Sequence, residues 1–222
     1  MVLEFFKGSS QSPIDTIEAT LVQMLCAGDD VFVTATNALF GGGKSKETKQ
    51  EVRSTDHQIN EAQQEIRRAL MVHAAVGAGD LPLVLQYASI VKDAERIGDY
   101  AKNVYDLVRY GADFDAADDR DELARYRDNV SRLIRDAAGV FASHDTEAAK
   151  RLIGKADGFL DDYDARVKAA YRSEGTASDA VSRALYFRYL KRMTAHVMNV
   201  LTALVQPLDR LDYYDEAKED RD

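Results

Sequence analysis

The sequence predicts an all-α protein of six helices, arranged as two three-helix bundles in tandem. The 222 residues include only three prolines and no tryptophan. Long stretches rich in Ala, Leu, Arg, Glu and Asp run without the punctuation that strands and tight turns need. Apolar residues recur at alternating spacings of three and four, which is the pattern of helices that pack on helices. Together these observations favour helical bundles over any sheet-containing fold.

Composition excludes several classes of protein. The formal net charge of -9 argues against nucleic acid as the main partner, because phosphate binding needs clustered Lys and Arg. A single cysteine, Cys26, excludes a disulfide scaffold, and its apolar surroundings predict a buried thiol. No apolar run approaches the roughly 18 to 20 residues that a membrane span requires. We therefore expect a cytoplasmic protein.

The first three helices have recognisable ends. Ser12 is placed to cap a helix that has Pro13 in its first turn, and the run of three glycines at 41–43 ends that helix. A second helix is predicted from about 46 to about 76, and glycines at 77 and 79 close it. The third begins at Asp80 and continues to Tyr110. Its apolar seam consists of Tyr87, Val91, Ala94, Gly98, Ala101, Tyr105 and Val108.

The acidic segment 113–121 is the best candidate boundary, dividing the chain into units 1–112 and 113–222. A fourth helix is predicted from near Asp119 and a fifth from Thr146 to about Tyr171. The sixth is predicted to run from Asp179 toward Leu211, after a turn rich in Gly, Ser and Thr.

An internal repeat is predicted from the seams of corresponding helices. A single constant offset carries the third-helix seam from Val91 onward onto Phe187, Leu190, Thr194, Val197, Leu201 and Leu204. The same offset carries Arg96 onto Arg192 and Asn103 onto Asn199, so polar positions match as well. The chain is therefore interpreted as two related three-helix units with pseudo-two-fold symmetry.

Two carboxylates, Glu95 and Asp99, stand one helical turn apart on the third helix. Acidic pairs at this spacing usually lie on a solvated face. Gly98 between them, however, indicates close approach of another helix, since glycine costs about 1 kcal/mol in a helix interior. The second helix carries Asp56 and Asn60 at the same spacing. If the two helices pack antiparallel, these four oxygen-bearing side chains could converge.

Such a cluster suits a hard or borderline cation, such as Mg, Mn, Ca or Fe, better than structural zinc. The sequence predicts a divalent or iron-type ion without deciding which. A ferritin-like di-iron enzyme is excluded, because none of the four histidines has a Glu three residues before it. Histidine phosphotransfer through His57 or His196 is a minor alternative, since a lone helical histidine is usually a packed or surface residue.

The segment 93–103, DAERIGDYAKN, closely resembles the signature of the PhoU family of phosphate-signalling proteins, and Asp56, Ile59 and Asn60 fit its preceding helix. The resemblance implies two tandem three-helix bundles over nearly the whole chain. It also implies metal binding through acidic motifs, with Glu95 and Asp99 as ligands that Asp56 and Asn60 face. The implied role is regulation by contact with subunits of a phosphate ABC transporter, a sensor histidine kinase, or both.

The second unit departs from the signature, because Lys191 and Ala195 stand where its acids would be. Asp157 and Asp161 remain on the fifth helix, so Lys191 could neutralise them in place of a metal. We therefore expect at most one metal site, in the first unit. No catalytic set is found, and membrane association is expected only through partners. A homodimer, an accessory protein of another phosphate or cation transporter, and a metal-dependent helical-bundle enzyme remain open alternatives.

Overall fold

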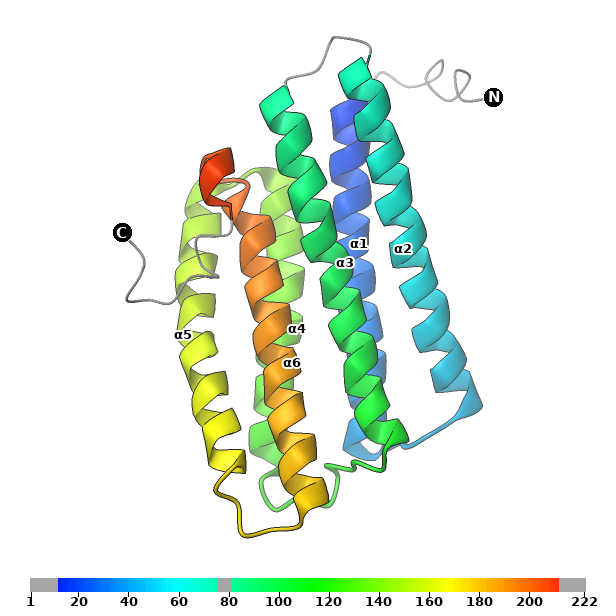
Figure 1. The fold of residues 1–222 in the computed structure, drawn as a ribbon, viewed down its shortest axis with the longest axis vertical. Helices are drawn as coiled ribbons and strands as arrows, with labels where there is room; N and C mark the ends of the chain where they lie inside the picture. Colours follow the sequence, from blue (N-terminus) through cyan, green and yellow to red (C-terminus); the bar gives the residue numbers. More distant parts are fainter. Residues whose placement is uncertain (1–11, 76–80, 212–222) are drawn as a thin grey trace.

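A computed structural model describes residues 12–75 and 81–211, and within these ranges all six predicted helices are present (Figure 1). They run side by side along the long axis of the molecule. Their bounds are α1 Pro13–Asn37, α2 Lys46–Ala75, α3 Leu81–Arg109, α4 Arg120–Ser143, α5 Thr146–Ala170 and α6 Ala177–Thr202. A π-helical turn, η1 (Ala38–Gly42), follows α1, and a 3-10 helix, η2 (Leu208–Arg210), follows α6. The all-α prediction is confirmed.

The predicted ends of α1 are confirmed by local geometry. The Ser12 hydroxyl accepts a hydrogen bond from the backbone N–H of Asp15, and the Asp15 carboxylate accepts one from the backbone N–H of Ser12. At the other end, Gly41 and Gly43 have φ angles of 110° and 62°, which L-residues with a side chain rarely adopt. This left-handed backbone ends η1 and leads the chain into α2. The predicted turn at 76–80, with Asp80, lies outside the described residues.

One hydrophobic core receives side chains from all six helices. α1 packs against α2, α3 and α4, while α3 also packs against α6. In Figure 1, α2 and α5 lie at the two outer sides of the bundle. All seven residues of the predicted α3 seam are buried. The three helices of each predicted unit are consecutive, but their apolar faces meet in a shared interior. None of the helices in the described part of the chain combines the length and the hydropathy of a membrane span.

Two details of the sequence prediction are wrong. α6 ends at Thr202 and does not continue to Leu211, because Pro207 has no backbone N–H to donate and disfavours helical backbone at the residue before it. The Thr202 hydroxyl instead donates a hydrogen bond to the Leu211 carbonyl, 2.6 Å away. Cys26 is exposed, since the neighbouring Leu25 faces the core and Cys26 points away from it.

Candidate functional site

The predicted site lies where α2 and α3 pack antiparallel (Figure 1). Gly98 on α3 allows the two helices to approach closely. A Cβ atom added to Gly98 would lie 2.7 Å from the Cδ1 atom of Ile59 on α2. Any side chain larger than hydrogen would therefore force one of the two helices or Ile59 to move. The prediction that Gly98 marks the close approach of another helix is confirmed. This close approach places the polar positions of α2 and α3 within reach of each other.

Asp56 and Asp99 are joined by a lysine that the sequence prediction did not include. The Lys102 ammonium nitrogen, Nζ, lies 2.8 Å from Oδ1 of Asp56 and 3.0 Å from Oδ1 of Asp99. Burial lowers the pKa of Lys102, but its hydrogen bonds to the two carboxylates outweigh that effect and raise the pKa overall. The pair of acids thus holds a positive charge supplied by the protein itself.

The remaining acid of α3, Glu95, lies in a less favourable environment. Burial raises its pKa most, the neighbouring charge of Asp99 raises it further, and Arg96 opposes the shift. Arg96 is itself shared, since it lies 4.0 Å from the Glu95 carboxylate and 3.3 Å from that of Asp99. Glu95 is therefore the acid of this cluster that would gain most from an added cation.

The predicted ligands are brought together only in part. Asp56 and Asp99 meet through Lys102, Glu95 stands one turn from Asp99, and Asn60 is half-buried one turn from Asp56 on α2. Among the described residues, no group of three or more His, Cys, Asp or Glu side chains is placed to hold a metal ion. The donor atoms match a hard cation in type and charge, but such an ion would have to displace Lys102. The metal site stays a prediction.

The counterpart site in the second unit contains an ion pair. Lys191 donates to Oδ2 of Asp164 on α5, at 2.5 Å. The sequence named Asp157 and Asp161 as its neutralised acids, and Asp164 lies nearly one further turn along the same helix. Residues three or four positions apart share a helix face. The sequence therefore predicted the correct face of α5 for the partner of Lys191, but it did not include Asp164.

A buried polar cluster between α3 and α6 was not predicted. His196 donates from Nδ1 to Oδ1 of Asp93, at 2.7 Å, and the Asn199 amide donates to the same oxygen at 3.1 Å. The His196 side chain is only 9% exposed, and the Tyr100 ring stacks on it with centroids 5.6 Å apart. This burial argues against phosphotransfer by His196. Asp93 belongs to the recognised segment, yet only the tertiary fold shows that its partners lie on the last helix.

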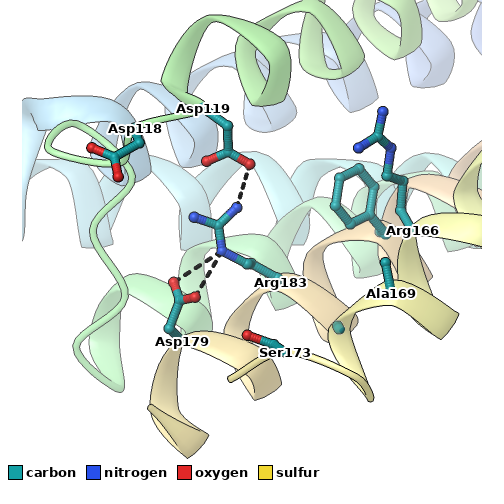
Figure 2. A pocket seen from close by; sticks show the side chains of 9 residues that line it. Asp118, Asp119, Arg166, Ala169, Ser173, Asp179 and Arg183 are labelled. Carbon is teal, nitrogen blue, oxygen red and sulfur yellow. Dashed lines mark hydrogen bonds and ion pairs between the residues drawn. The ribbon is translucent and has the colours of Figure 1, made fainter. Parts of the chain in front are cut away.

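A second charged cluster lies at the beginnings of α4 and α6 (Figure 2). Figure 2 shows the Arg183 guanidinium between two carboxylates, and its nitrogens lie 2.6 Å from Asp119 and 2.8 Å from Asp179. The hydrogen bond to Asp119 is the main cause of the raised pKa of Arg183. Arg166, which lines the same pocket, pairs with Glu122. Both cations are occupied by carboxylates, which indicates a structural role.

Comparison with known proteins agrees with the resemblance seen in the sequence. The sequence model of a protein family, described as the PhoU domain, matches residues 23–108 of this chain. A phosphate-specific transport system accessory protein PhoU homolog from Synechocystis sp. is 25% identical over 199 residues, covering 86% of this chain and 87% of that protein. The crystal structure of the phosphate transport system regulatory protein PhoU from Streptococcus pneumoniae has a TM-score of 0.74 at 20% identity, covering 87% of this chain and 93% of that one.

A second solved structure shows the same architecture. PhoU from Pseudomonas aeruginosa superposes with a TM-score of 0.71 at 22% identity, covering 89% of this chain and 97% of its own. These two structural likenesses establish the fold over most of the chain. The sequence match at 23–108 adds that α1, α2 and α3, with the segment 93–103, carry the recognisable signature.

Proposed function

We propose that this chain, whose resemblance to the PhoU family is confirmed in sequence and in fold, is a regulator of phosphate transport. The observation that carries the proposal is the PhoU match over 23–108, because it includes the segment 93–103 and the helix that faces it. The fold by itself would not suffice, since one fold can serve several functions.

The proposed mode of action is protein contact without catalysis. The Synechocystis relative is named as an accessory protein of a phosphate-specific transport system, which supports a transporter as partner. We propose that the chain acts in the cytoplasm and reaches the membrane through such a partner, either subunits of a phosphate ABC transporter or a sensor histidine kinase. Regulation would then follow from which partner it binds at a given phosphate level.

Affinity purification tests the proposal. The full chain, tagged and expressed at its natural level in its own host, would be recovered from cells grown with ample phosphate and from cells starved of it. We expect transporter subunits or a sensor kinase to be enriched over a tag-only control, in an amount that changes with phosphate supply. Recovery of another transporter would favour the accessory-protein alternative. Phosphate uptake unchanged by deletion of the gene would contradict the proposal.

The metal site is part of the proposal for the α2–α3 face. One divalent or iron-type ion would bind Glu95, Asp99 and Asp56, with Asn60 as a further oxygen donor. The raised pKa of Glu95, caused by burial and by Asp99, supports this assignment because a cation would relieve both effects. The ion would compete with Lys102 for the same oxygens, so the site would be sensitive to substitution of that lysine.

A further inference from the structure

A separate polar pocket opens between α3 and α6. Its volume is about 500 Å³. The charged and polar side chains that matter for the argument are Lys92, Asp93 and Arg96 from α3, and Arg192, His196 and Asn199 from α6. The pocket lies on the boundary between the two predicted units, so both halves of the chain contribute to it.

Among the described residues, three cations line this pocket, and two of them have no carboxylate partner in that part of the chain. Within the described ranges, neither Lys92 nor Arg192 makes an ion pair, whereas eight of the described arginines do. Arg192 is positioned by a hydrogen bond from its Nε to the Tyr100 hydroxyl, at 3.4 Å. Arg96 is shared with Asp99. The contrast with Arg183, which two carboxylates hold, indicates that the positive charge here is available to a ligand.

Asp93, the carboxylate that lines the pocket among the described residues, is held in place by two residues of α6. Asp93 accepts both of its hydrogen bonds, from His196 and from Asn199, on Oδ1. No hydrogen bond from the described residues reaches its other oxygen, Oδ2, which is the acceptor that we assign to a molecule in the pocket. Nε2 of His196 is buried without a hydrogen-bond partner among the described residues, so a polar atom of this cluster also remains unsatisfied. A carboxylate is acceptor-only when ionised, and it repels an anion that lacks a hydrogen to donate.

We infer that the α3–α6 pocket binds a phosphate group that retains a P–OH. Lys92 and Arg192, which make no ion pair within the described ranges, supply charge for its oxygens, since guanidinium and ammonium are the usual partners of phosphate. Asp93 accepts the P–OH hydrogen and so discriminates against sulfate, which has the same shape but no hydrogen at neutral pH. This site is distinct from the α2–α3 cluster and does not depend on the proposed metal.

The test is isothermal titration calorimetry on the full chain at pH 7, with inorganic phosphate, sulfate and glycerol phosphate as probes. We expect saturable binding of inorganic phosphate and at least tenfold weaker binding of sulfate. Glycerol phosphate separates the two sources of the group: at pH 7 most of it is the dianion, which has no P–OH, so we expect it to bind more weakly than inorganic phosphate. Equal binding of the two would contradict the role of Asp93 as the acceptor of a P–OH hydrogen. Arg192→Gln should weaken phosphate binding at least tenfold, as should Lys92→Gln.

Arg188→Gln is the matched control, because Arg188 lies one turn from Arg192 on α6, is exposed, and does not line the pocket. Its phosphate affinity should equal that of the unmodified chain. Circular dichroism of each variant would confirm that α6 is intact. The inference is overturned if none of the phosphate probes binds, or if the Arg192 and Arg188 variants bind phosphate equally. Neither result would bear on the purification of partners, so the two proposals fail separately.

Discussion

Gly98 of α3 packs directly against Ile59 of α2, and a Cβ atom added to Gly98 would lie 2.7 Å from the Ile59 Cδ1 atom. We expect Gly98→Ala to lower the free energy of unfolding by about 1 kcal/mol. Overpacking of a core typically costs 1–3 kcal/mol, which exceeds the roughly 1 kcal/mol that alanine gains in helix propensity. Urea denaturation would measure the loss.

Ile59→Val provides the control, because it deletes the clashing Cδ1 atom. The nearest remaining Ile59 atoms would lie 3.7 and 3.9 Å from the new Cβ, which is ordinary contact. Ile59→Val alone should cost about 1 kcal/mol. In that background Gly98→Ala should stabilise the chain, giving a coupling of about 2 kcal/mol in the double-mutant cycle. Strictly additive effects would show that the contact does not limit the packing.

Asp93→Ala should destabilise the chain by about 3 kcal/mol, because it removes the buried carboxylate to which His196 and Asn199 donate. Asp106→Ala is the control on the same helix. Asp106 pairs with Arg109 at the surface, where ion pairs contribute less than about 1 kcal/mol. Thermal and urea unfolding would compare the two variants. Similar losses for both would contradict a special role for the buried cluster.

Lys102→Gln should increase the affinity of the α2–α3 carboxylates for a divalent cation, because it removes the ammonium that lies between Asp56 and Asp99. Calorimetry with Mn²⁺, together with the metal content of the purified chain, would measure the change. We expect an increase of about tenfold, which corresponds to roughly 1.4 kcal/mol.

Glu95→Ala combined with Asp99→Ala is the companion test of the metal site. This double variant should lose the bound ion that the unmodified chain retains. Equal metal content in both proteins would reject the site, whatever the Lys102 variant does. Unfolding curves recorded in EDTA would separate loss of ligands from loss of fold.

Glu95→Gln should stabilise the metal-free chain at pH 7. Burial and Asp99 raise the pKa of Glu95 above its ordinary value, so the folded state binds a proton more readily than the unfolded state does. The cost of the charged carboxylate is present above the raised pKa, and it disappears as pH falls below the ordinary value. The gain from Gln should therefore shrink with acidification. It should stay below about 1 kcal/mol, because the side chain is 18% exposed and its charge is partly screened by water.

Thermal unfolding in EDTA across pH 4 to 8 would measure that difference. A stabilisation that grows toward low pH would mean that Glu95 is held in its charged form by the fold, contrary to the assignment. No difference at any pH would mean that its environment is as polar as water.

Helix number, most helix ends and the α3 seam were predictable because they depend on local periodicity and on capping residues. The end of α6 was missed because the run of apolar residues continues past Thr202, and Pro207 was not weighed against it. The burial of Cys26 was wrong because an apolar neighbourhood in sequence does not decide which face of a helix a residue occupies.

The candidate site was predictable only as a set of positions on two helices. Asp56 and Asp99 do approach each other, as the antiparallel packing required, but the lysine that joins them stands on the same helix as Asp99 and resembled a solvated charge. The pairing of Asp93 with His196 joins residues far apart in the chain. No local pattern contains that information, since it depends on how α3 meets α6.

The single shared core has a consequence for how the molecule loses its structure. The buried faces of α1 and α3 are completed by α4 and α6, so neither three-helix unit encloses its own interior. Separating the halves would expose apolar surface on both sides of the cut, at roughly 25 cal/mol for each Å². The unit of cooperativity is therefore the two predicted units together, and unfolding that begins in either one exposes the apolar faces that pack against the other.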